Sequence, residues 1–243
     1  MLGIADENLP PLTAAFPLRV HSDVSGLVVA LGSGISVGVE VRDEMSENTR
    51  GNGAHQISLQ MTPQEFPQST SSIMVPPNPS DPRAPTRFSG LAPDTYEVSG
   101  WPNGPWYIAS MRCGSVDLLR DDLTLALGAA PPPIEVTLRD DGAQLTVKTM
   151  ENGRPAIAGV VIFSREYPKR TLLAGSVYST SMSNLAPGTY YVMAMRGAES
   201  LEFRSPGAME RYLAHAREVN LGPRGDVTVE VEVQAPEQGE EAP

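Results

Sequence analysis

One short segment occurs twice in the sequence, and this repeat constrains the fold more than any other feature. Leu-Ala-Pro-Asp-Thr-Tyr-Glu-Val occupies Leu91–Val98, and Leu-Ala-Pro-Gly-Thr-Tyr-Tyr-Val occupies Leu185–Val192. Six of the eight positions are identical, and the two copies begin 94 residues apart. A repeat at this spacing predicts two copies of one module of about 100 residues, the size of a small β-sandwich.

Short runs of alternating apolar and polar residues predict that each module is built of β-strands. The clearest run extends from Val227 to Val233, where four valines alternate with threonine and glutamate, as in a strand with one buried face. Similar runs begin at Ile35, Ile57 and Ile134. The 22 glycines and 23 prolines among 243 residues favour many short strands joined by turns.

One segment has helical spacing instead. Met209, Tyr212, Leu213 and Ala216 fall on one face of a short amphipathic helix, so a helix is expected over Ala208–Val219.

Prolines mark the expected boundary between the modules. Ala129–Pro133 contains three consecutive prolines and predicts a stiff, extended linker. A long loop is expected over residues 62–87, which are rich in proline, serine and glutamine. The expected organisation is a lead-in segment (1–18), a first β-sandwich (19–128), the linker (129–133), a second β-sandwich (134–235) and an acidic, disordered tail (236–243).

Charge excludes two classes of partner. The net charge is −11 and the chain has only two lysines, whereas nucleic-acid binders need clustered basic side chains to displace phosphate counterions. An anionic membrane surface would repel the chain for the same reason. No apolar stretch approaches the ~20 residues of a membrane-spanning helix, so no direct membrane insertion is expected.

Both repeated segments resemble the Leu-x-Pro-Gly-x-Tyr stretch of carboxypeptidase regulatory-like domains, which have a transthyretin-like (prealbumin-like) fold. The run Trp106–Asp117 resembles the stretch that follows it in large bacterial secreted proteins, and Phe203–Leu221 resembles the end of their C-terminal module. The resemblance covers about residues 19–235. It implies an all-β chain of two tandem Ig-like/prealbumin-like antiparallel β-sandwiches, with one short helix near Ala208–Val219.

The position of the tyrosine separates this resemblance from the fibronectin type III domain. There the tyrosine lies six residues after the leucine, whereas Tyr96 and Tyr190 lie five residues after Leu91 and Leu185. The proline-containing turn sets a sharp corner, over which the tyrosine ring is expected to pack while its hydroxyl finds a backbone partner.

No arrangement of residues predicts catalysis, a metal or a cofactor. His21, His55 and His215 are isolated from other ligand types, and the regulatory-like domain is the non-catalytic part of such peptidases. The single cysteine, Cys113, forbids an intramolecular disulfide and is expected to be a small buried side chain. Because a Ser-His-Asp triad is set by geometry, an unrecognised hydrolase remains a second alternative function.

Two further motifs have ordinary structural explanations. Arg224-Gly225-Asp226 matches an integrin-type tripeptide, but glycine and aspartate also favour turns. Lys148 and Asn220 lie near the first and last strands of the second module, where related sandwiches carry an isopeptide crosslink. Because Val147 takes the inward position, Lys148 is expected to face solvent.

Trp101, Trp106 and Tyr107 form the one aromatic cluster in the sequence. Exposed rings could stack on sugars, which makes a carbohydrate-binding module the first alternative function. The competing interpretation is that these rings pack in the core or over a loop.

The expected function is therefore a non-enzymatic structural, adhesion or spacer module of a larger exported protein. A protein or polysaccharide partner is compatible with this role, and the expected location is extracellular or in the cell envelope, on the strength of the resemblance. The first residues have no basic region or long apolar stretch, so the export signal and further domains are expected upstream.

Overall fold

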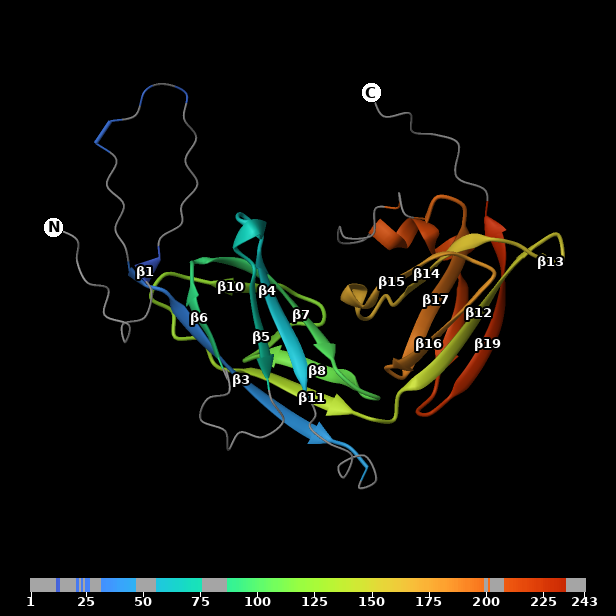
Figure 1. Ribbon diagram of the computed structural model, residues 1–243, viewed down its shortest axis with the longest axis horizontal. Helices are drawn as coiled ribbons and strands as arrows, with labels where there is room; N and C mark the ends of the chain where they lie inside the picture. The colour runs from blue at the N-terminus through green and yellow to red at the C-terminus, as the bar shows by residue number, and fades with distance from the viewer. Residues whose placement is uncertain are drawn as a thin grey trace. The chain divides into compact units, whose positions relative to one another are not determined.

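The chain divides by its internal contacts into two compact units (Figure 1). The computed structural model describes residues 12–13, 21, 23, 25–26, 32–46, 56–75, 87–198, 201 and 208–234. The first unit comprises Met1–Asp43, Arg50–Gly104 and Ser110–Leu138, and the second comprises Glu44–Thr49, Pro105–Ala109 and Arg139–Pro243. The expected tail lies outside the described residues, as does the expected lead-in apart from Leu12–Thr13.

Two main sheets make up the first sandwich. One has the order β10-β7-β4-β5 and the other the order β6-β3-β11-β8-β9, while β1 (Leu12–Thr13) pairs with β2 (Gly32–Ser33). The strands are β3 (Ile35–Glu44), β4 (Ile57–Pro63), β5 (Ser71–Val75), β6 (Arg87–Leu91), β7 (Asp94–Pro102), β8 (Tyr107–Cys113), β9 (Val116–Asp117), β10 (Leu123–Leu125) and β11 (Ile134–Arg139).

The predicted alternation in the first sandwich is confirmed. Ile57, Leu59 and Met61 of β4 are fully buried, and the residues between them are partly exposed. The expected loop over 62–87 is wrong in part, because it contains a 3-10 turn, η1 (Pro67–Ser69), and strand β5. Leu127 lies beyond the end of β10 and is 87% exposed.

The boundary between the units differs from the expected one. Ile134, Val136 and Leu138 were expected to open the second module, but β11 pairs between β3 and β8 in the sheet of the first. The alternating pattern identifies a strand but cannot tell which sheet the strand completes. The chain therefore crosses to the second unit after Leu138, not after the prolines.

The second sandwich has both of its layers joined in one continuous sheet. Its order is β13-β12-β19-β17-β14-β15, with β16 paired to β12 and β18 paired to β17. The strands are β12 (Ala143–Glu151), β13 (Arg154–Pro155), β14 (Ala158–Phe163), β15 (Leu172–Val177), β16 (Ser179–Leu185), β17 (Gly188–Met195), β18 (Arg217–Leu221) and β19 (Asp226–Gln234). A 3-10 turn, η2 (Pro168–Arg170), precedes β15.

The first and last strands of the second sandwich are parallel neighbours. β12 and β19 pair over residues 144–150 and 226–232. The expectation of antiparallel sandwiches is confirmed for most strand pairs and is wrong for this one and for the short pairing of β17 with β19, which is also parallel. Sequence alternation is the same for parallel and antiparallel strands with one buried face, so it could not reveal the difference.

The expected helix is present but shorter. It is a 3-10 helix, η4 (Ala208–His215), and Val219 lies instead on β18, where it is buried. Figure 1 shows the helix, in orange, beside β17. Its residues Met209, Tyr212 and Leu213 contribute to an apolar cluster on that sheet, so the predicted apolar face is confirmed.

Both repeated segments form the same tyrosine corner. The Tyr96 hydroxyl donates to the Ala92 carbonyl at 2.8 Å, and the Tyr190 hydroxyl donates to the Ala186 carbonyl at 2.9 Å. Both rings are buried, and burial raises the pKa of each hydroxyl above its ordinary value. The predicted packing and backbone partner are thus confirmed in both copies.

The two modules also share a β-bulge just before each repeated segment. Gly90 and Asn184, one residue before Leu91 and Leu185, both have a positive φ, of 73° and 59°. The strand register shifts at each of these places, in β6 against β3 and in β16 against β12. A bulge with a left-handed residue favours glycine or asparagine, which explains why these two residue types stand there.

A glycine lies against each bulge. A Cβ on Gly34 would come 2.4 Å from the Gly90 backbone, and one on Gly142 would come 2.8 Å from the Asn184 backbone. Both distances are shorter than a carbon contact allows, so each module needs a glycine at the start of its first strand.

Candidate functional site

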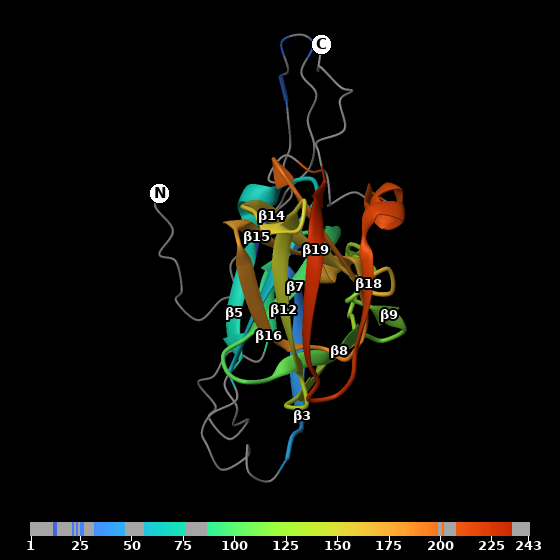
Figure 2. The same ribbon diagram turned by 90° about the vertical axis from the view of Figure 1, so that its right-hand side faces the viewer.

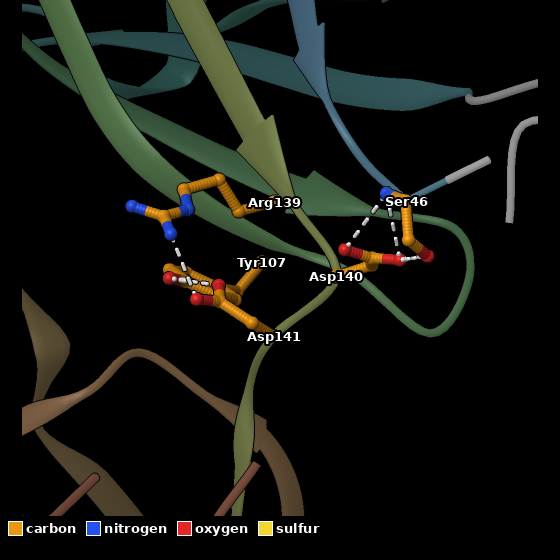
Figure 3. A network of polar contacts seen from close by, with 5 residues as sticks. All are labelled: Ser46, Tyr107, Arg139, Asp140 and Asp141. Carbon is orange, nitrogen blue, oxygen red and sulfur yellow. Dashed lines mark hydrogen bonds and ion pairs between the residues drawn. The ribbon is translucent and has the colours of Figure 1, made fainter. Parts of the chain in front are cut away.

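A network of polar contacts surrounds the turn that leads into β12 (Figure 3). Asp140 and Asp141 of this turn contact Ser46, Tyr107 and Arg139, and all five residues belong to the second unit. Glu44, Met45, Pro223 and Arg224 complete an open hollow of about 430 Å³ around the turn.

Asp140 holds the backbone that follows β3. Its two carboxylate oxygens accept the Ser46 amide at 3.2 and 3.1 Å, and the Ser46 hydroxyl also donates to this carboxylate. Ser46 follows the end of β3 and Asp140 follows the end of β11, so the bonds fasten two neighbouring strands at the same end. The two strands therefore run in the same direction, as their arrows in Figure 1 also show.

Asp141 is paired at both carboxylate oxygens. The Tyr107 hydroxyl donates to one oxygen at 2.9 Å, and the Arg139 guanidinium donates to the other at 2.8 Å. Burial, together with the hydrogen bond to Asp141, raises the pKa of Tyr107 to about 12. The tyrosine therefore stays protonated as a donor, and the arginine supplies the charge that this half-buried carboxylate needs.

The same turn fixes the backbone of the Arg224-Gly225-Asp226 tripeptide. The Arg224 amide donates to the Asp141 carbonyl at 2.9 Å, and the Gly225 carbonyl accepts the Gln144 amide at 2.7 Å. Asp226 is the first residue of β19. The tripeptide is therefore a rigid strand connection, which matches the structural explanation of the motif.

The hydrogen bonds of this cluster hold chain segments of the protein together. Its carboxylates accept hydrogen bonds from within the protein, and two of the three partners, Ser46 and Tyr107, come from segments distant in sequence. Asp140-Asp141-Gly142 is a sequence typical of a turn, and no local pattern relates it to Ser46 or Tyr107. The side-chain partners lie up to 94 residues away, beyond the reach of local patterns.

The predicted aromatic cluster does not form a flat platform. Trp101, on β7, is 51% exposed, whereas Trp106 and Tyr107 are each only 8% exposed. A surface that stacks on sugar rings needs exposed ring faces, so two of the three residues have the packing role that was the competing interpretation.

The other candidate residues have ordinary surroundings. The described residues contain no group of three or more His, Cys, Asp or Glu side chains arranged to hold a metal ion. The Cys113 thiol is buried, donates to the Pro132 carbonyl at 3.3 Å and has a pKa raised by burial. His215, at the end of η4, and His21 are exposed, and His55 lies outside the described residues. Over the described part of the chain, none of the helices has the length and apolar character to cross a membrane.

Lys148 and Asn220 do not form a crosslink pair. Lys148 is exposed and the adjacent Val147 is buried, as predicted from the alternation. The Asn220 side chain accepts a 2.7 Å hydrogen bond from the Thr189 hydroxyl.

A second open hollow, of about 560 Å³, lies on the outer face of the second sandwich. The Arg165 guanidinium pairs with Glu210 at 3.2 Å, and the Tyr191 hydroxyl donates to Glu218 at 3.2 Å. The first contact connects the segment after β14 to η4, and the second joins paired residues of β17 and β18, so the hollow lies beside η4.

Comparison with known proteins gives only distant likenesses. No family model and no curated protein matches the chain. Similar solved structures include the TIE protein of Bacillus anthracis (10% identity, TM-score 0.28, 82% of this chain and 34% of that one). Others are the minor pilin of Streptococcus agalactiae (10%, 0.27, 79% and 87%) and the shaft pilin SpaA of Lactobacillus rhamnosus GG (8%, 0.26, 87% and 100%). The chain thus spans about a third of the first of these, and scores this low do not establish a shared function.

Proposed function

We propose that the chain is a non-enzymatic structural module, a spacer that transmits load within a larger exported protein. The observation that carries the proposal is the parallel pairing of the first and last strands of the second sandwich. The chain enters this sandwich at the start of β12 and leaves it at the end of β19. Tension between these two points pulls the strands in opposite directions along their length.

Such tension loads the hydrogen bonds of the β12–β19 ladder in shear. In this geometry the bonds share the load and break together, whereas strands peeled from one end lose one bond at a time. The first sandwich has the same arrangement, because β3 and β11 are adjacent and their ends are fastened by Ser46 and Asp140. Two modules in series that each resist extension suit a spacer.

Exported location is part of the proposal and rests on the resemblance to carboxypeptidase regulatory-like repeats of bacterial secreted proteins. The net charge of −11 suits a soluble, exposed module. A partner, if one is held, is a protein or a polysaccharide of the cell surface.

Single-molecule extension of the whole chain through handles at its two ends tests the proposal. We expect two separate unfolding events, each of which releases roughly 30 nm of chain, since an extended residue spans about 3.5 Å. A gradual extension without defined events would show that neither module bears load.

A further inference from the structure

Strands β15 and β16 form an edge of the second sandwich and carry no charged side chain. From Thr171 to Met195 the sequence contains no Asp, Glu, Lys, Arg or His, although 19% of all residues are Asp, Glu, Lys or Arg. β15 leads through Tyr178 directly into β16 (Figure 2). The described strands pair with β15 only through β14 and with β16 only through β12, so each has a second edge that no described strand pairs with.

Exposed apolar side chains gather at the same edge. Leu173 is 41% exposed and Tyr178 is 55% exposed. Ile157, 49% exposed, precedes Ala158, which pairs with Val177, so Ile157 lies opposite Tyr178. These three are half of the large apolar side chains that are exposed among the described residues.

Natural proteins protect such an edge with charges, prolines or bulges, because its free backbone groups can pair with another strand. The first module has that protection in its sequence. Ser71 and Ser72 occupy the register positions of Leu172 and Leu173, and five prolines and two charged residues stand between Val75 and Arg87. From Leu172 to Leu185 the second module has a bulge in β15 and another in β16, but no charged residue or proline.

We propose that this edge is the docking surface for a second copy of the chain, paired β15 to β15 in antiparallel fashion. Antiparallel pairing of one edge with itself is two-fold symmetric, which is the commonest way that identical chains associate. The net charge favours this edge over more acidic parts of the surface as the place where two copies meet. Two chains of net charge −11 repel each other over most of their surfaces, and a 25-residue stretch without charge is where that repulsion is least.

Sedimentation velocity of the whole chain over a concentration series tests the proposal. We expect a reversible dimer whose population rises with protein concentration. Its population should also rise with added salt, since salt screens the repulsion between the two acidic chains. A wild-type chain that stays monomeric up to millimolar concentration at high salt contradicts the proposal.

Charged variants locate the contact. Leu173→Lys and Leu173→Glu should each abolish the dimer, and an equimolar mixture of the two should restore it, because opposite charges then lie on the two adjoining strands. Leu127→Lys is the matched control, since Leu127 is exposed in the first module and the net charge changes equally. Tyr178→Lys is a second disrupting variant, and unchanged urea midpoints verify that each variant folds.

The outcomes separate this surface from the proposed spacer role. Loss of the dimer in Leu127→Lys, or its survival in both Leu173→Lys and Tyr178→Lys, overturns the edge contact. Neither result bears on the single-molecule extension experiment, which measures unfolding of one chain at a time.

Discussion

The outer faces of the two modules differ, although the strands that form them pair in the same register. With Tyr96 aligned to Tyr190, the β4–β7 pairs coincide with the β14–β17 pairs. The outward positions of the first module are Ser58, Gln60, Thr62, Glu97, Ser99 and Trp101, and the matching positions of the second are Gly159, Val161, Phe163, Tyr191, Met193 and Met195.

The difference follows from the connection between the last two strands of this sheet. In the second module the connection from β17 to β18 carries η4 and lies over the sheet, where Ala198 and Tyr212 pack on Val161 and Phe163. In the first module the corresponding connection from β7 to β10 contributes β8 and β9 to the opposite sheet. The same arrangement of strands therefore supports either a polar outer face or a second apolar core. The outcome depends on whether one connection lies over the outer face or joins the opposite sheet.

The largest expected effect comes from Phe163→Ala, which empties the centre of the second module's outer core. Loss of this buried ring should destabilise the second module by about 3–5 kcal/mol. The matched change in the first module, Thr62→Ala, should cost only about 0.5 kcal/mol, because its side chain is partly exposed. Hydrogen exchange in increasing urea, followed separately for peptides of each module, measures both. Equal losses would show that the outer faces do not differ energetically.

An intermediate effect is expected from exchanging small residues between the modules. Gly159 has no room for a side chain, since a Cβ there would lie 2.5 Å from that of Ala198. Gly159→Ser should therefore lift the covering segment and destabilise the second module by about 1–3 kcal/mol. Gly175→Ala is the control, because nothing lies within 4 Å of a Cβ at that position. An unchanged exchange rate around Leu213 in the serine variant would contradict the packed cover.

A smaller and equal effect is expected where the modules are alike. Tyr96→Phe and Tyr190→Phe each remove one hydroxyl and leave the Ala92 or Ala186 carbonyl without that donor. Each change should destabilise its own module by roughly 1–2 kcal/mol. Module-resolved unfolding in urea measures the pair, and a large effect in only one module would break the equivalence of the two corners.

The smallest effect is a difference in alkaline stability. A tyrosine whose pKa is raised on folding adds stability that is complete below its unfolded pKa of about 10 and is lost as the pH rises through its folded pKa. The second compact unit contains two such groups, Tyr190 and Tyr107, the latter at the start of β8 and with a pKa of about 12, whereas the first unit contains Tyr96. The second unit should therefore lose more stability between pH 10 and 12. Tyr107→Phe should reduce that loss, as urea titrations at each pH would measure.

The sequence predicted most of the strands and the tyrosine corners. It did not predict how the strands are distributed between the two modules and their sheets. The tyrosine corners followed from the repeat, because a turn and its tyrosine are a local device. The unbroken apolar run Val160–Phe163 is typical of a strand buried on both faces, and β14 is buried at every position.

What could not be predicted depends on distant contacts. Ile134 opens a strand that completes the first sandwich, and nothing in its alternation says which sheet it joins. The Asp140–Ser46 and Asp141–Tyr107 bonds join segments 94 and 34 residues apart. A single sequence without aligned relatives holds no signal for such pairs.

The direction of pulling tests the load-bearing role most directly. In one pulling geometry the second module is extended through handles at Ala143 and Gln234, the start of β12 and the end of β19. This geometry loads the hydrogen bonds between the two strands in shear. In the other it is extended through Asn152 and Gln234, which lie at the same end of the two strands, so the ladder is peeled. The spacer role predicts a clearly higher unfolding force in the first geometry, and equal forces in the two geometries would contradict it.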